Sequence, residues 1–396
     1  MMLTYIFALS LFQAALPSVD ISNARPNGIS VPFQINDIRA DGFRMGADYS
    51  LTWESGGKTL EIPAQVSPQR GGSVFVILPA ETVSSPGDIQ ASIHESAVKK
   101  TQSAFQFVER DNKQLYIYEG GQPVLAYNFG VISRIGAPLN RARSCYIHPL
   151  YGLDGVPVSE DFPTDHYHHR GLFWTWPQVM VGDKKADIWM ANIGGQQFGN
   201  WLYKEKGQVC ALFGVRNYWH VGGEKVVEEI AEFTVYRVGE AGRAIDVCLR
   251  WKSLGEPVSI QGQDAGGYGG FNLRPAPRSP ELPVITTSSG VQEKDSNLVP
   301  FPWGDYSADF YGRGIVSGVA IFVDKGHSGY PPGWTLRHYG FLGVAWPGNV
   351  PLQIPTDRYL EAKYRVWIHK GDCQEGRVEE AFGFFDNPPL LKFNGN

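Results

Sequence analysis

The chain lacks the features that mark several common protein classes. It has 4 cysteines in 396 residues, far apart and with no C-x-x-C pair, so a finger-type zinc site is not expected. Beyond the N-terminus no stretch approaches the roughly 20 apolar residues of a membrane helix, and no membrane span is expected. The net charge of −5 is spread along the chain without a basic stripe, which argues against nucleic acid as a partner. No glycine-rich loop stands between a strand and a helix, which argues against a nucleotide-binding α/β fold.

Aromatic residues, glycine and proline are abundant instead, with 11 Trp, 18 Tyr, 22 Phe, 46 Gly and 27 Pro. Residues 244–251 place Ile245, Val247, Leu249 and Trp251 alternately with polar neighbours, a period of two typical of a strand buried on one face. Residues 359–369 repeat the pattern, and helix-like spacing occurs only at 378–385. These patterns predict an all-β fold.

The chain divides into three parts by composition. Residues 1–18 hold an apolar run followed by small residues, which predicts a signal peptide and a periplasmic or secreted protein; the alternative is a buried first strand. Residues 19–107 contain short strands separated by turn residues, which predicts a small β-sandwich subdomain. Residues 108–396 carry longer strands and the histidine-rich segment described next.

Residues 143–179 concentrate ionisable and aromatic side chains as no other segment does. Titratable groups cluster where chemistry or tight binding takes place, although ion networks give the same signal. The segment therefore predicts a site of action without naming the reaction. Its polar and aromatic residues of interest are His148, Glu160, Asp161, Asp165, His166, His168, His169, Arg170, Trp174 and Trp176.

If residues 165–176 are extended, His166, His168 and Arg170 project from one face. Two imidazoles at that spacing can transfer protons or hold one divalent metal ion. A metal site needs a third ligand, for which His148, Glu160 and His338 are the candidates. A hydrogen-bonded network of His and Asp that only braces a loop is the structural alternative.

Two later segments add polar candidates. Asn272 and Arg274 follow a glycine-rich stretch, and Arg337 and His338 follow Pro331-Pro332. Asn272 and Arg274 could equally cap a turn and pair with a surface acid. Trp174 and Trp176 fit a buried strand as well as they fit a platform for a sugar ring.

Four motifs, in order, resemble a bacterial family that is labelled "methane oxygenase PmoA". They are D-H-Y-H-H-R-G (165–171), Y-G-G-F-N-L-R-P (268–275), P-P-G-W-T-L-R-H-Y-G (331–340) and Y-R-V-W-I-H (364–369). The oxygenase label fits poorly, since true methane monooxygenase subunits lie in the membrane. Other members carry Glu where this chain has Ala265 and His where it has Thr335.

The resemblance implies an antiparallel β-supersandwich of the galactose-mutarotase-like type, and a carbohydrate context by analogy. The expected function is an exported carbohydrate-active enzyme of the epimerase, lyase or hydrolase type, acting on a small sugar or oligosaccharide. The alternatives are a non-catalytic carbohydrate-binding protein and a metal-dependent oxygenase or isomerase. No cofactor is demanded by the motifs, and a divalent metal on His166 and His168 stays open. The catalytic candidates are His166, His168, Glu160 and Asp165, and the substrate-binding candidates are His148, His169, Arg170, Trp176, Asn272, Arg274, Arg337 and His338.

Overall fold

The protein is described by a computed structural model that covers residues 18–24, 29–35, 43, 47–55, 57–70, 73–79, 87–96, 103–190, 195–279, 283–388 and 390–394. Within these residues the strands form four sheets, in which neighbouring strands are antiparallel. The expected all-β sandwich architecture is therefore confirmed. The predicted signal peptide lies outside the described residues, except for Ser18.

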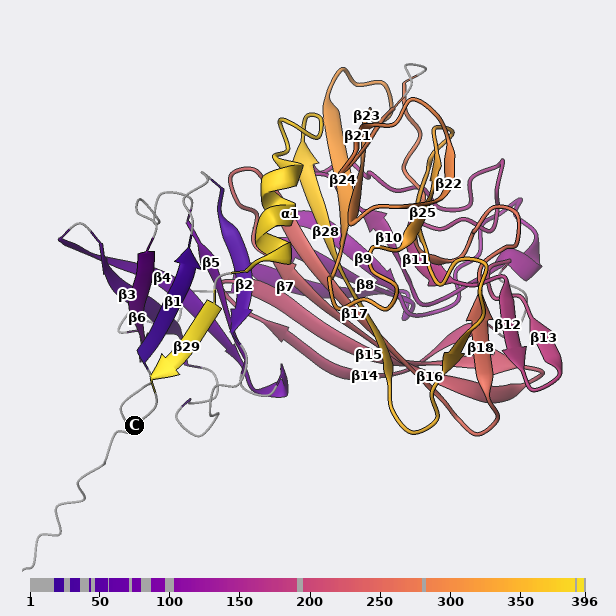
Figure 1. The fold of residues 1–396 in the computed structure, drawn as a ribbon, viewed down its shortest axis with the longest axis horizontal. Coiled ribbons are helices and arrows are strands. Elements are labelled where there is room, and N and C mark those ends of the chain that lie inside the picture. Colours follow the sequence, from indigo (N-terminus) through magenta and orange to yellow (C-terminus); the bar gives the residue numbers. More distant parts are fainter. Residues whose placement is uncertain are drawn as a thin grey trace, which may run out of the picture.

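The N-terminal sheet has seven strands and its own apolar core. Its last strand comes from the C-terminus of the chain, so the yellow β29 lies beside the indigo β1 in Figure 1. The predicted partition placed this C-terminal segment in the larger domain. In spatial order the strands are β2 (Val31–Ile35), β5 (Ser73–Leu78), β4 (Lys58–Ser67), β3 (Tyr49–Ser55), β6 (Gly87–Glu95), β1 (Ser18–Ala24) and β29 (Leu390–Asn394).

A nine-stranded sheet, called sheet I here, begins the larger part of the molecule. The boundary expected at residue 107 falls inside its edge strand β7, which pairs only with β8. The order is β22 (Ser296–Pro300), β25 (Gly333–Arg337), β26 (Phe341–Ala345), β19 (Gly270–Leu273), β11 (Leu172–Thr175), β10 (Tyr146–Leu150), β9 (Gln122–Asn128), β8 (Gln114–Glu119) and β7 (Phe105–Arg110).

A second nine-stranded sheet, sheet II, packs against sheet I. Trp174 of sheet I lies 6.0 Å from Phe233 of sheet II, and Phe271 stacks on Tyr364 at 4.2 Å, both measured between ring centroids. The order of sheet II is β14 (Gln196–Lys206), β15 (Cys210–Val221), β16 (Glu224–Tyr236), β17 (Gly242–Ser253), β28 (Leu360–Lys370), β24 (Val316–Val323), β23 (Trp303–Asp309), β20 (Val284–Thr287) and β21 (Gly290–Val291).

A four-stranded sheet and one helix complete the described elements. The helix α1 (Val378–Asp386) confirms the helix-like spacing and packs on β24 and β28. Two short 3₁₀ turns span Pro68–Arg70 and Leu139–Arg141. The four-stranded sheet runs β13 (Lys184–Ala186), β12 (Gln178–Val181), β18 (Val258–Gln261) and β27 (Leu352–Ile354).

The alternation of apolar and polar residues in β17 buries one face of the strand, as expected. Ile245, Val247, Leu249 and Trp251 are buried in the core between the sheets, whereas the residues between them are partly exposed. Each such buried aliphatic side chain contributes about 1.5–3 kcal/mol by leaving water. The alternation in the sequence therefore reports directly which face of sheet II meets sheet I.

Candidate active site

The site forms where four strand ends of sheet I meet. Antiparallel pairing places Leu172 opposite Leu273, Leu273 opposite Leu342, and Leu342 opposite Leu336. The start of β11 and of β26 therefore shares one edge with the end of β19 and of β25. Segments that precede or follow these strands, at residues 166–170, 274 and 337–341, are brought together although the first and the last are more than 150 residues apart in the chain.

The site lies on the face of sheet I that points away from sheet II. Leu172 and Trp174 belong to the core between the sheets, so Phe173, which alternates with them, faces the other way. There it packs in a small buried cluster with Tyr146, Trp189 and Phe341. These aromatic side chains lie beneath the polar groups of the site.

Residues 163–169 form turns rather than the extended segment expected from the sequence. The backbone N–H of His166 donates to the carbonyl of Pro163 (3.1 Å), and the N–H of His169 donates to the carbonyl of His166 (2.8 Å). The expected row of His166, His168 and Arg170 is therefore not formed. His166 stacks instead on His169, with centroids 4.7 Å apart and planes 6° apart.

Tyr339 extends this stack on the other side of His166, at 5.1 Å and 6°. His168 meets the edges of both rings, 5.6 Å from His166 and 4.5 Å from His169. We call His166, His168, His169 and Tyr339 the histidine cluster. It brings together three predicted candidates and one tyrosine that sequence reasoning missed, although Tyr339 directly follows a predicted residue.

A chain of charges links the cluster to β19. The buried guanidinium of Arg274 donates from Nε to Glu160 Oε2 (3.2 Å) and from Nη2 to Asp165 Oδ1 (2.9 Å). Asp165 Oδ2 in turn lies 3.0 Å from His166 Nδ1, and the side chain of His166 is 35% exposed. Four of the predicted residues are thus joined in the order Glu160, Arg274, Asp165, His166.

Arg170 and Asp161 form a second, more deeply buried pair. Arg170 Nη1 donates to Asp161 Oδ1 (3.2 Å), and Arg170 Nη2 donates to the carbonyl of Arg141. The hydroxyl of Tyr146 donates to the other oxygen of Asp161 (2.9 Å). Because Asp161 already receives these two bonds, it holds Arg170 in place under the histidine cluster.

The environment keeps two of the histidines neutral. Burial, together with the charges of His166, Arg141, Arg143 and Arg170, lowers the pKa of His168 to about 3. Burial also lowers the pKa of His169 well below its usual range, and neighbouring charges add to that shift. Both imidazoles are therefore unprotonated at neutral pH, with one ring nitrogen free to accept a proton or a hydrogen bond.

The pKa values of the two carboxyl groups beside Arg274 are shifted in opposite directions. Burial raises the pKa of Glu160, and Arg274 only partly offsets this. Burial also acts to raise the pKa of Asp165, but hydrogen bonds from His166 and Arg274 outweigh it, so the pKa is lowered. Environments that separate the pKa values of neighbouring acids are typical of sites that need a proton donor beside a fixed negative charge.

The remaining predicted residues lie at or beyond the margin of this site. Arg337 Nε donates to the Tyr268 hydroxyl (2.8 Å), which lies 3.4 Å from the Tyr339 hydroxyl. His338 points elsewhere: its Nδ1 is 2.8 Å from Asp295 and its Nε2 is 2.9 Å from the carbonyl of Gln292. Only Arg337 is therefore tied to the cluster, through Tyr268.

Three further candidates are packed into the structure. Trp176 is buried in the core, where its indole N–H donates to the Trp346 carbonyl (2.7 Å), so it offers no platform to a ligand. Asn272 is buried and donates to the carbonyl of Gly270 (2.6 Å). His148 Nδ1 lies 3.0 Å from Ser159 Oγ, and burial lowers its pKa.

Metal ligation has little geometric support in the part of the chain that is described. No group of three or more His, Cys, Asp or Glu side chains there is arranged to hold a metal ion. The third-ligand candidate His338 is bonded to Asp295, and Glu160 to Arg274. The four cysteines are all free, and burial raises the pKa of Cys145.

Ala265 and Thr335, two positions noted in the sequence, lie close to each other. The hydroxyl of Thr335 donates to the carbonyl of Gly266 (2.8 Å), the neighbour of Ala265. Thr335 is buried on the same face as Arg337, two residues along β25. This hydrogen bond from a side chain to the main chain joins β25 to the glycine-rich segment.

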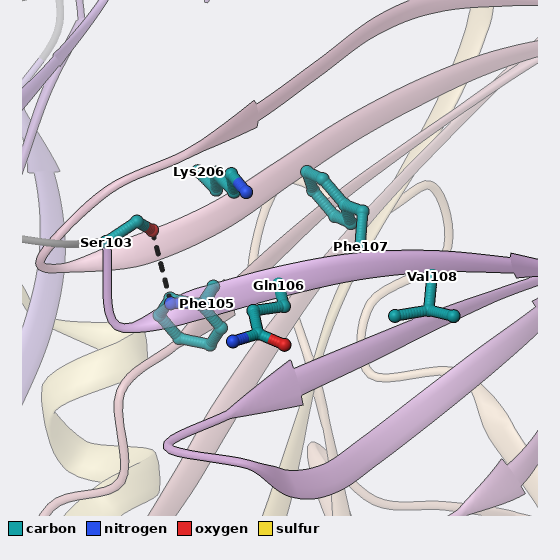
Figure 2. A pocket seen from close by; sticks show the side chains of 6 residues that line it. All are labelled: Ser103, Phe105, Gln106, Phe107, Val108 and Lys206. Carbon is teal, nitrogen blue, oxygen red and sulfur yellow. Dashed lines mark hydrogen bonds between the residues drawn. The ribbon is translucent and has the colours of Figure 1, made fainter.

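A hollow lies at the edge strand β7, and none of its lining residues belongs to the histidine cluster. Its volume is about 370 Å³, and Figure 2 shows its lining residues on β7, among them Phe107 and Val108, together with Lys206 of β14. The hydroxyl of Ser103 accepts a bond from the Phe105 N–H (3.2 Å) at one end. With one lysine as its only ionisable lining residue, this hollow offers no acid–base pair.

Comparison with known proteins gives a family and distant structural neighbours. A family model described as "Family of unknown function (DUF6807)" matches residues 114–383. The methane oxygenase label has no support from this match. No curated protein matches the chain. Among the described residues, no helix is long and apolar enough to cross a membrane.

Three solved structures are similar at low level. A putative mutarotase (YeaD) from Salmonella typhimurium has 8% identity and a TM-score of 0.29, covering 70% of this chain and 97% of its own. A putative kojibiose phosphorylase from human microbiome has 8% identity and a TM-score of 0.29, covering 52% of this chain but only 25% of its own. A 4-alpha-glucanotransferase from Thermococcus litoralis has 11% identity and a TM-score of 0.25, covering 68% and 42%. All three are named for activities on carbohydrates.

Proposed function

The chain belongs to DUF6807, a family described only as being of unknown function, so we propose its function from the geometry of the site. The proposed function is that of an enzyme that transfers a proton on a carbohydrate. His168 is the proton acceptor, since it is neutral and partly exposed at the cluster. His166, backed by Asp165, is the proton donor. The reaction class is epimerisation, elimination or hydrolysis, all of which need a positioned acid and base.

The observation that carries this proposal is the sequence of contacts Arg274, Asp165, His166. A buried guanidinium fixes a carboxylate, and that carboxylate faces Nδ1 of a partly exposed imidazole. A carboxylate this close to an imidazole can hold the ring in position beside a substrate. The arrangement prepares one nitrogen to give a proton to a group outside the protein.

The carbohydrate part of the proposal is supported by the aromatic rim. Tyr268 and Tyr339 are partly exposed, and their hydroxyls lie 3.4 Å apart beside Arg337. Apolar ring faces next to a few convergent polar groups are typical of small-molecule sites. A sugar ring, with an apolar face and a hydroxyl edge, matches such a surface. Export to the periplasm or medium belongs to the proposal and is supported only by residues 1–18.

The test is to incubate the purified protein in D₂O with a panel of neutral and acidic oligosaccharides. NMR and mass spectrometry then report new products and exchange of carbon-bound hydrogen. We expect His168→Ala to lower the rate by about 10²–10⁴-fold, the usual contribution of an acid–base group, with an unchanged melting temperature. His94→Ala, at a partly exposed histidine of the N-terminal sheet, is the matched control and should keep the full rate.

The rival function is carbohydrate binding without catalysis. It is favoured by the low pKa of His168, because a base that weak abstracts protons poorly unless a ligand raises its pKa. Sugars that bind in calorimetry yet are recovered intact and without deuterium would establish the rival. A turnover rate of His168→Ala equal to that of the unmodified protein would remove the acid–base role from this residue.

A further inference from the structure

Several buried donors around the histidine cluster have no partner. Arg143 Nη1, Arg170 Nε and Arg274 Nη1 are each buried without a hydrogen bond, and so is His169 Nδ1. The four residues are between 0% and 6% exposed. Guanidinium N–H groups can only donate, so three of these four atoms call for an acceptor. Native proteins satisfy the great majority of buried polar groups, which makes this concentration informative.

Arg143 stands out because its charge is also uncompensated. Arg170 and Arg274 have carboxylate partners, at 3.2 Å and 2.9 Å. Arg143 Nη2 instead donates to the main-chain carbonyl of Ile188, and no ion pair of Arg143 is found among the described residues. Asp187 favours the Arg143 cation from a distance, but its carboxylate accepts the N–H of Met190. Burial and the nearby Arg170 lower the pKa of Arg143 to about 9.

These guanidinium groups surround the neutral histidines. The guanidinium of Arg143 lies over Phe173, 5.9 Å from its centroid, and Phe173 in turn packs against His169 and Trp189. Arg274 lies over Tyr339 at 5.5 Å, at the other side of the histidine stack. Arg143 and Arg274 thus approach the histidine cluster through two different aromatic neighbours, Phe173 and Tyr339.

We infer that the ligand of this site is a sugar of the uronic acid class, one carboxylate of which accepts hydrogen bonds from the unpartnered guanidinium groups. This inference rests on the proposed function and names its substrate class. A carboxylate matches the paired N–H groups of arginine in shape and charge. A single negative charge suffices, because only Arg143 among the three arginines lacks an acidic partner.

The bound carboxylate also changes His168. Burial disfavours the protonated form of His168 most, and His166, Arg141, Arg143 and Arg170 add to this effect. His169 beside it is neutral, and Trp189 carries no charge. A negative charge set among the arginines offsets their effect and raises the basicity of His168. Binding of the acidic substrate therefore makes His168 a stronger proton acceptor.

The first experiment uses the unmodified protein and needs no variant. Calorimetry compares digalacturonate with its methyl ester, with neutral galactobiose and with glucose 6-phosphate. We expect digalacturonate to bind at least about 10-fold more tightly than the neutral sugars, the difference made by hydrogen bonds to a charged group, and to weaken as salt is added. Equal affinity for the ester, or preference for the phosphate, overturns the inference.

The second experiment replaces the arginine. Arg143→Met should bind digalacturonate at least about 10-fold more weakly, while its melting temperature stays equal to or rises above that of the parent, because an unpaired buried charge is removed. Arg358→Met, at a residue whose side chain is 75% exposed, is the control and should change neither. A variant that retains full uronate affinity contradicts the inference. If Arg143→Met fails to fold, Arg274→Lys takes its place with the same expected loss of affinity. This substitution keeps the positive charge but removes the paired N–H groups of the guanidinium.

A third measurement separates this inference from the proposed function. NMR of labelled histidine should show His168 neutral down to pH 4 without ligand and titrating above pH 4 with saturating digalacturonate. Tight uronate binding with this shift but without turnover supports the inference and rejects catalysis. Turnover of neutral sugars with no uronate binding supports catalysis and rejects the inference.

Discussion

Two buried polar networks of this protein differ in how completely they are satisfied. In sheet II the carboxylate of Glu229, fully buried, accepts bonds from Asn217 (2.9 Å), Trp219 (2.9 Å), Trp251 (2.9 Å) and Gln196 (3.1 Å). At the histidine cluster of sheet I, donors of three arginines are buried without any partner. The hydrogen bonds of the first network, called the closed network here, are all made within the chain. The second network has donors that a ligand could use.

The positions of the two networks explain the difference. The Glu229 network lies in the core between the sheets, where three strands, β14, β15 and β17, supply its donors and Glu229 is fully buried. The histidine cluster lies on the outer face, where His166 and Asp165 remain partly exposed. A polar group buried in the core must be satisfied by the chain itself, since an unmade bond there costs about 1–3 kcal/mol. At the surface-reachable site a ligand can supply the missing acceptors.

The largest expected effect follows from removing the centre of the closed network. Glu229→Ala removes an acceptor from four buried side chains and leaves the indole N–H groups of Trp219 and Trp251 with none, so we expect the free energy of unfolding to fall by at least about 3 kcal/mol. Urea denaturation measures it. Glu361→Ala, at an exposed glutamate of β28, is the control and should cost below about 0.5 kcal/mol. A loss below about 1 kcal/mol in Glu229→Ala would mean that the closed network is not structural and would erase the contrast.

A smaller effect is expected from the pH dependence of stability. The pKa of His168 is 6.5 in the unfolded chain and about 3 in the folded one. Between these values the unfolded chain binds a proton that the folded site refuses, so the free energy of unfolding decreases as the pH falls below about 6.5. His168→Gln removes this contribution.

Urea denaturation of both proteins between pH 7 and pH 4 measures the change. The slope of stability against pH should differ between them by up to one bound proton, with the variant less sensitive to acid. His94→Gln should leave the slope unaltered. Parallel curves for His168→Gln and the parent would show that this imidazole is already charged, or exposed, in the folded protein.

The smallest effect on stability is expected at Asp165, whose side chain is 46% exposed. Its pKa is lowered, so its contribution is present above the unfolded pKa of about 3.9 and is lost as the pH falls through the folded value. Asp165→Asn should cost below about 1 kcal/mol at pH 7, as for exposed ion pairs, and nothing at low pH.

Catalysis should respond to the same substitution far more than stability does, because Asp165 orients His166. Thermal melts at pH 7 and pH 3 and the D₂O assay together measure the two effects. Asp357→Asn, at an aspartate that is 75% exposed, is the matched control. A stability loss comparable to that of Glu229→Ala would make the cluster a structural brace like the closed network.

Local patterns predicted the strands well because burial of one face imposes a period of two. β17 and the hairpin at residues 119–122, where Gly120 and Gly121 both adopt positive φ, follow the expectation. β28 departs from it, since Arg365, Trp367 and His369 are buried as well as the apolar face. The reason is tertiary: Trp367 packs beside α1, and His369 bonds to Asp305 of β23 at 2.8 Å, contacts that no local pattern reports.

The candidate site shows the same limit. The histidine-rich segment and Arg274 were singled out from residue types alone, because such groups rarely gather without a reason. The sequence did not predict the turns of residues 163–169 or the stacking of His166 on His169. It also did not predict the contact between His338 and Asp295. Arg143 and Tyr339 lie inside segments that the sequence marked, but residue type alone gave no reason to choose them as site residues.

By itself the sequence determined the strand content, the face of each strand that is apolar and the segment in which histidines and acids gather, because these follow from periodicity and composition. Only the tertiary structure decided which distant residues share a site. Antiparallel register sets the start of β11 beside the end of β19 and the start of β26, and this pairing depends on the whole sheet. It also decided which buried donors remain without acceptors, since satisfaction of a polar group is a property of its neighbours in space.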